Sequence, residues 1–107
     1  MPVIGKVELK ADKDVTAGTE TSISDLFPYS ERRKEFTLES DVERDKTKIK
    51  VTITKLGSFE TVADTTKKKG EKTDLWMILK ATDFSRKIKA TEAIKKGDVL
   101  TVTIESI

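Results

Sequence analysis

The sequence predicts an all-β protein, which we expect to be an antiparallel β-sandwich of about seven strands, compatible with a Greek-key order, with a small β-barrel as the alternative. Thr, Val and Ile supply 32 of the 107 residues, and these β-branched types favour strands. Several segments alternate between apolar and polar residues, and short turn segments separate them. The length is that of one domain, residues 1–107.

The first strand is expected at residues 3 to 11. Val7 and Leu9 alternate there with Lys6, Glu8 and Lys10. This period of two is typical of a strand with one buried face.

Residues 34 to 55 are predicted to form a β-hairpin that turns about Arg44 and Asp45. This register places Phe36 opposite Ile53 on one face and Glu39 opposite Lys50 on the other. Both kinds of pair stabilise antiparallel neighbours, so the pattern specifies the register twice.

The remaining strands are expected at 58 to 65, 73 to 82, 86 to 91 and 99 to 106. Residues 75 to 79 are all apolar, which favours a central strand covered on both faces, with Trp76 in the core. A buried helix is the alternative for this segment. Carbohydrate binding is not expected, because it needs an exposed aromatic ring. The sequence shows no internal repeat that we recognise.

Residues 16 to 33 form the longest irregular segment. One helical turn is expected at its centre, capped by Ser22 or Ser24 and ending before Pro28. The apolar residues of this segment are candidate anchors of a protein interface, namely Leu26, Phe27 and Tyr29. Burial of these three at one end of the sandwich is the alternative.

Missing residue types remove several classes of chemistry. The chain has no Cys and no His, which excludes disulfides, thiolate nucleophiles, catalytic triads and the usual zinc sites. We therefore expect neither an enzyme nor a bound cofactor or metal. Asn and Gln are also absent and 37% of the residues are charged, which favours a thermophilic source, with computational design as the competing explanation.

No membrane span and no signal peptide are apparent in this numbering, and the localisation stays open. The longest apolar run has five residues, far below the roughly 20 that cross a bilayer. A soluble protein is therefore expected.

Two charged clusters have simple interpretations as solvated surface. Glu39, Asp41, Glu43 and Asp45 recur at every second residue, as the outer face of a strand does, and their spacing does not fit a calcium loop. The triplet 32 to 34, Arg-Arg-Lys, reads as a charged loop that enters a strand.

The most basic feature is a loop that offers an alternative function. An OB-like barrel could bind nucleic acid through such a loop, and its candidate contacts are Lys67, Lys68, Lys69 and Lys72. Nearby acidic residues dilute the positive field, and the net charge of the chain is only +2.

The function that we expect is a non-catalytic structural or interaction module from a thermophile. It would be a subunit or decoration of a larger assembly, such as a virion, an appendage or a surface structure. Its partner would be protein, either a second copy or another chain of the assembly, bound through sheet edges or loop side chains. Nucleic-acid binding is the alternative, and a designed scaffold without natural function is the third.

Overall fold

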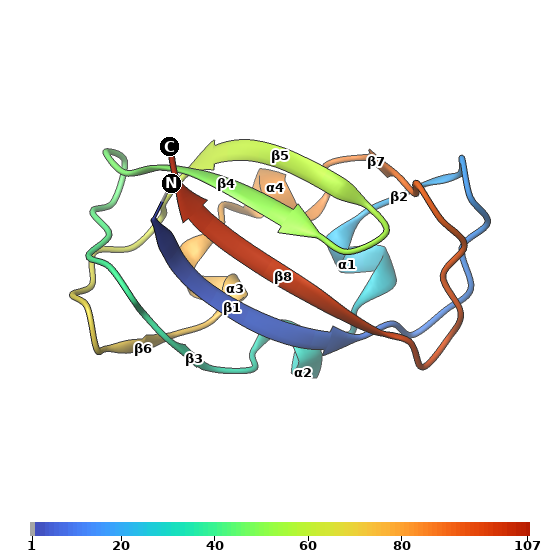
Figure 1. The fold of residues 1–107 in the computed structure, drawn as a ribbon, viewed down its shortest axis with the longest axis horizontal. Coiled ribbons are helices and arrows are strands. Elements are labelled where there is room, and N and C mark those ends of the chain that lie inside the picture. Colours follow the sequence, from blue (N-terminus) through green and yellow to red (C-terminus); the bar gives the residue numbers. More distant parts are fainter. Residues whose placement is uncertain (1) are drawn as a thin grey trace.

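One four-stranded antiparallel sheet forms the front layer of the molecule in Figure 1, in the order β1-β8-β4-β5. The computed structural model describes residues 2–107. The four strands are β1 (Val3–Lys10), β4 (Lys48–Ile53), β5 (Gly57–Val62) and β8 (Val99–Ser106).

Two short ribbons and four single-turn helices lie behind this sheet (Figure 1). One ribbon pairs β2 (Glu20–Thr21) with β7 (Ile88–Lys89), and the other pairs β3 (Phe36–Thr37) with β6 (Lys72–Thr73). The helices are α1 (Ile23–Leu26), α2 (Tyr29–Arg32), α3 (Leu75–Ile78) and α4 (Ala81–Phe84). The domain is thus mostly strands, and within residues 2–107 its sheets do not close into a barrel.

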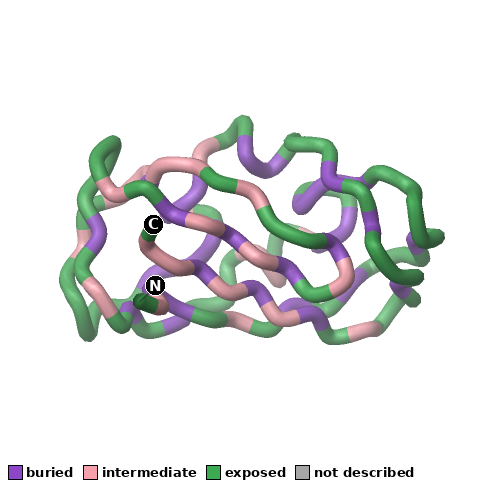
Figure 2. Tube along the Cα trace, turned by 45° about the horizontal axis from the view of Figure 1, so that its top comes forward, coloured by how far each residue is buried: buried purple, intermediate pink, exposed green. Residues whose placement is uncertain are grey.

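The core lies between the sheet and the helical layer. In β4 and β8, alternate residues are buried while their neighbours remain partly exposed, as Figure 2 shows along both strands. Ile23, Leu26 and Phe27 cover this apolar face from one half of the chain, and Leu75 and Ile78 cover it from the other. Burial of one face of β4 and of β8 is therefore what joins the two layers.

The chain contains an internal repeat with approximate two-fold symmetry. Residues 3 to 45 correspond to residues 55 to 97 with an offset of 52, and residues 47 to 53, which include β4, correspond to residues 98 to 104 at the start of β8 with an offset of 51. The order β1-β8-β4-β5 maps onto itself when the halves are exchanged, because β4 pairs with β8 at its centre. The two ribbons also exchange, since each joins one strand from each half.

Equivalent hydrogen bonds confirm this symmetry atom by atom. The amide of Asp12 donates to the carbonyl of Leu26, and the amide of Asp64 donates to that of Ile78, both at 2.9 Å. At each end of the molecule, one loop from each half meets the other through an isolated bridge (Figure 1). Our statement that the sequence has no internal repeat was wrong, because the equivalent positions share residue class and seldom identity.

Side-chain caps explain why the helices α1 and α3 begin where they do. Ser22 Oγ accepts a hydrogen bond from the amide of Asp25 at the start of α1. Asp74, its equivalent, accepts from the amide of Met77 through Oδ1 at 2.9 Å at the start of α3. Each cap satisfies an amide that the first helical turn leaves without a partner.

Several predicted elements are confirmed. The strands expected at 3 to 11, 58 to 65 and 99 to 106 are β1, β5 and β8, and the helical turn capped by Ser22 is α1.

The predicted hairpin at 34 to 55 is wrong. Phe36 pairs with Thr73 across the β3–β6 ribbon, while β4 pairs with β5 and β8. The alternation of apolar and polar residues predicted correctly which side chains are buried, but it predicted the wrong strand pairing. Alternation sets the buried face of a strand and does not encode which strand lies alongside it.

The strand predicted at 73 to 82 is also wrong, and the alternative of a buried helical segment describes it better. Only Lys72 and Thr73 of this segment belong to a strand, and α3 and α4 follow. Leu75, Ile78 and Leu79 face the core, whereas Trp76 is 50% exposed. Spacings of three and four residues are helical, so the prediction that placed Trp76 in the core fails.

The strand expected at 86 to 91 is reduced to the two residues of β7, Ile88–Lys89. No helix among residues 2–107 has the length and hydropathy that a bilayer crossing requires.

Candidate binding groove

Of the three predicted interface residues, the structure leaves one on the surface. Leu26 and Phe27 are buried at 0% and 1% exposure, so they belong to the core, as the alternative proposed. Tyr29 is 52% exposed at the start of α2. The interface expected at 16 to 33 is therefore reduced to Tyr29 and the polar residues near it.

The predicted basic loop lies against an acidic loop. The backbone of Lys67 bridges that of Val42, and the amide of Lys69 donates to Asp41 Oδ1 at 2.7 Å. Lys68 and Lys72 are exposed. The lysines thus share one end of the molecule with the acidic residues of the loop before β4, which lowers the local positive potential.

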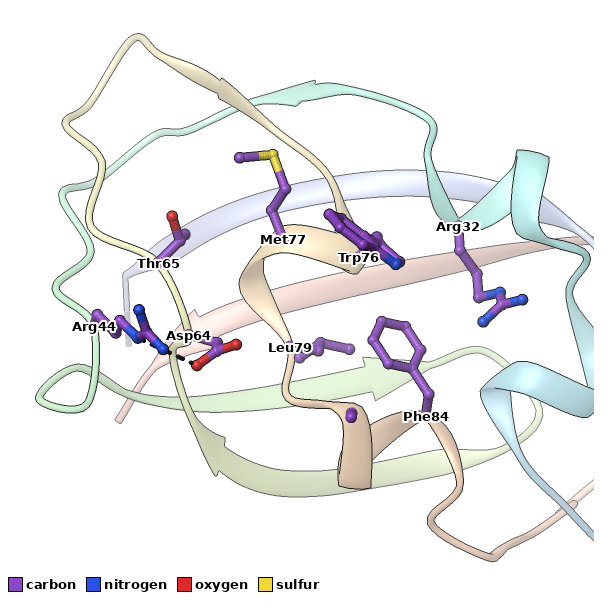
Figure 3. Close-up of a pocket in the computed structure, with 9 residues that line it drawn as sticks. Arg32, Arg44, Asp64, Thr65, Trp76, Met77, Leu79 and Phe84 are labelled. Carbon is purple, nitrogen blue, oxygen red and sulfur yellow. Dashed lines mark ion pairs between the residues drawn. The ribbon is translucent and has the colours of Figure 1, made fainter.

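An open groove of about 600 Å³ lies on the helical side of the molecule (Figure 3). Its apolar lining comes from the second repeat, with Trp76, Met77, Leu79, Ala81 and Phe84. Its polar lining consists of Arg32, Arg44, Asp64 and Thr65. The volume lies in the range of small-ligand and side-chain pockets, and the mixed lining suits a partner with both apolar and charged groups.

Three aromatic rings and two arginines form a ladder along this side. The guanidinium of Arg33 lies 4.7 Å from the Trp76 ring centre and 5.6 Å from that of Tyr29. The guanidinium of Arg32 lies 5.8 Å from the Tyr29 ring centre and 5.7 Å from that of Phe84. Each spacing is that of a cation–π contact, so the ladder joins α2 of the first repeat to α3 and α4 of the second.

Arg33 is held in place by two hydrogen bonds. Its Nε donates to Asp74 Oδ2 at 3.0 Å, and its Nη1 donates to the hydroxyl of Tyr29 at 2.7 Å. The bonds to Tyr29 and Asp74 raise the pKa of the Arg33 guanidinium above its ordinary value. Asp74 therefore both caps α3 and fixes the cation that covers Trp76.

Arg32 differs from Arg33 because its charge has no partner. Its Nε is buried without a hydrogen-bond acceptor, and its side chain forms no ion pair within residues 2–107. Within residues 2–107, the cation–π contacts with Tyr29 and Phe84 are the interactions that the guanidinium makes. Arg32 as a whole is only partly buried, so its charge, which no acid of residues 2–107 neutralises, is available to an anionic group of a partner.

At the other end of the groove, the charged side chains are paired with one another. Arg44 and Lys80 lie 3.6 and 3.5 Å from Asp64, and Lys80 also bonds Asp45 at 2.9 Å. The Lys80 ammonium lowers the pKa of Asp45, and Asp45 in turn raises the pKa of Lys80. Two acids and two bases neutralise each other there, so Arg32 carries the unbalanced charge of the groove.

The two buried carboxylates already have structural partners. Asp83 accepts from the amide of Lys80 and from Thr61 Oγ1, both at 2.9 Å, and Asp74 holds α3 and Arg33. No cluster of three potential ligands for a metal ion occurs among residues 2–107.

Sequence reasoning missed the exposed side of α3 and interpreted Arg32 and Arg33 as a charged loop. The missing signal was Asp74, an N-cap residue directly before an apolar run. Had the run been treated as helical, Trp76 and Met77 would have emerged as its outward residues. Exposure of Trp76 also removes the premise on which carbohydrate binding was set aside.

The chain has no significant match to any protein-family model, curated protein or solved structure.

Proposed function

We propose that the protein is a non-catalytic interaction module that binds another protein chain through the groove beside Trp76. The observation that carries this proposal is a half-exposed tryptophan, rigidly backed by Arg33, next to an unpaired arginine. Tryptophan and arginine are the residue types most enriched among energetically dominant interface residues. Exposed large apolar side chains that cluster in a groove are typical of recognition sites.

The non-catalytic assignment rests on the state of the ionisable groups. The chain lacks His and Cys, and the carboxylates nearest the groove are engaged as caps or in ion pairs. A general base needs a free acceptor that can reach a substrate proton. Membership of a larger assembly, and a thermophilic source, are parts of the same proposal.

We further propose that the architecture is best classified as a sandwich of two layers. The four-stranded sheet would be one layer, and the two ribbons with their helices would be the other. Two faces that share one core support this classification.

Nucleic-acid binding through Lys67, Lys68, Lys69 and Lys72 is the second candidate function. The exposure of Lys68, Lys69 and Lys72 favours it. The sheets do not form the closed barrel from which that proposal began, and the adjacent acidic loop opposes a polyanion. A designed scaffold is the third reading, and the absence of binding to any partner would favour it.

The test is the solution mass measured by light scattering across concentration, with and without single-stranded DNA. Self-association that Trp76→Ser abolishes would support the proposal with a second copy as the partner. A mass increase only with DNA at low salt, lost when the four lysines become Glu, would replace it with nucleic-acid binding. An inert monomer would move the search to a different protein partner, which the peptide selection below tests.

A further inference from the structure

We propose that the groove recognises a peptide segment that presents a single carboxylate beside a large apolar or aromatic side chain. Arg32 would receive the carboxylate, and Trp76 with Phe84 would pack against the apolar group. This inference rests on the proposed function and names the chemistry of its partner.

The internal repeat supplies a comparison that shows which residues the fold itself does not need. Trp76 and Met77 occupy the positions of Ser24 and Asp25 in the first repeat, which has the same helical turn and the same kind of cap. Ser24 lies against the backbone, where its hydroxyl donates to the carbonyl of Phe84 at 2.9 Å. A small polar residue is therefore sufficient for this turn, and the turn itself does not require tryptophan at this position.

The same comparison separates core positions, which have the same residue class in both repeats, from surface positions at which the two repeats differ. Core positions keep their apolar class in both repeats, as Ile23 and Leu75 do, and both are buried. Arg33, in contrast, stands where the second repeat has Ser85. The ladder residues Trp76 and Arg33 thus have no counterpart of the same type at the equivalent site of the other repeat.

The charge of the groove favours one carboxylate over a polyanion. Arg33 is paired with Asp74, and Arg44 lies within ion-pair distance of Asp64, which leaves Arg32 as the unpaired cation. Nucleic acid is held by several phosphate contacts in succession, and one free cation does not provide them. A guanidinium stacked between two rings presents its remaining donors in a planar fork that matches a carboxylate.

The shape of the groove agrees with a side chain and its flanking backbone. Figure 3 shows that Trp76, Phe84 and Arg32 all line the groove, with Arg32 coming from a different segment than the two rings. A volume of about 600 Å³ accommodates an apolar side chain beside this charge. Leu79 also lines the groove, and its burial in the core fixes the position of this part of the lining.

The experiment begins with selection of a random peptide library, displayed on phage, on the immobilised full chain. Selection on Trp76→Ser in parallel removes peptides that bind elsewhere. The expected outcome is enrichment of Asp or Glu within one or two positions of Trp, Phe, Leu or Met. Synthetic versions are then titrated by fluorescence, because Trp76 is the sole tryptophan and reports occupancy directly.

Four variants test the roles of the residues, after circular dichroism shows that each is folded. Trp76→Ser should weaken binding about ten- to a hundredfold, measured by calorimetry since the fluorophore is lost. Arg32→Gln should weaken it to a similar extent, with Arg32→Lys in between, because lysine keeps the charge without the planar stack. The control Val99→Ser removes an equally exposed apolar residue on β8 and should leave affinity unchanged.

Four outcomes would overturn the inference. Peptides without a carboxylate, or peptides that bind Trp76→Ser equally well, would leave a protein-binding module with a different site. Quenching of Trp76 by an oligothymidine with a steep salt dependence would assign the groove to nucleic acid. Failure of the wild type to select any peptide, together with an inert monomer in light scattering, would overturn the proposed function as well.

Discussion

Gly5 is the position at which the packing makes its sharpest prediction. A Cβ atom added to Gly5 would lie 2.5 Å from Cδ2 of Phe36, far inside van der Waals contact. The Phe36 ring is 7% exposed and belongs to the core cluster, so it has little room to retreat. Gly5→Ala should therefore cost about 1–3 kcal/mol of unfolding free energy, as overpacked cores do.

The assay is urea unfolding followed by circular dichroism, with thermal unfolding as a second readout. For a domain of this size each kcal/mol corresponds to about 4–8 °C, so the melting temperature should fall by about 4–24 °C. The penalty must arise from the ring, because Gly5 does not have the positive φ that excludes alanine. Removing the ring should then remove the penalty.

The second repeat provides the matched controls. Ile88 is the equivalent of Phe36, and at Gly57, the equivalent of Gly5, a Cβ would meet nothing within 4 Å. In a Phe36→Ile background, Gly5→Ala should be nearly neutral, or stabilising by about 0.5–1 kcal/mol through its lower unfolded-state entropy. Gly57 has φ +93°, so Gly57→Ala should cost about 1–2 kcal/mol in either background through backbone strain. Equal costs of Gly5→Ala with and without the Phe36 ring would refute the packing argument.

Three further predictions follow from the caps, the charges and the symmetry. Asp74→Ala should lower the free energy of unfolding in urea by about 1–3 kcal/mol, because both the α3 cap and the ion pair with Arg33 are lost. Asp74→Ser should recover about 1 kcal/mol of this loss by restoring the cap. Equal destabilisation by the two substitutions would contradict the capping role. The hydrogen bond from the Lys95 amide, and after it the ion pair with Lys55, lowers the pKa of Asp98 below 3.8. The stabilisation that Asp98 contributes is therefore present above pH 3.8 and is lost on acidification through the lower pKa of the folded state. Asp98→Thr, which copies the equivalent Thr47, should flatten the fall in stability below about pH 4. A permuted chain that starts at residue 55, with 107 joined to 2 by a short linker, should unfold cooperatively like the parent. The reason is that the two ends of the chain lie side by side in Figure 1 and that the opened turn between β4 and β5 is their symmetry equivalent. A permuted chain without a cooperative transition would argue against that equivalence.

The sequence by itself determined the faces of the strands and the start of α1. Alternation in β1 and β8 requires no knowledge of the fold, because one buried face every second residue is a local property of a strand. The cap at Ser22 is equally local, since its hydroxyl bonds an amide three residues away.

Only the tertiary structure decided which strands pair and which site is specialised. β4 could satisfy its faces with any alternating neighbour. The next strand in the chain, β5, pairs with it through a tight turn, whereas its pairing with β8 depends on closing the core shared by the two repeats. The arginine ladder is a stronger case, because Tyr29 and Trp76 are 47 positions apart in the chain and meet only through Arg33. Pairing energies in a sheet and contacts between helices depend on long-range closure of the chain, which a local pattern does not encode.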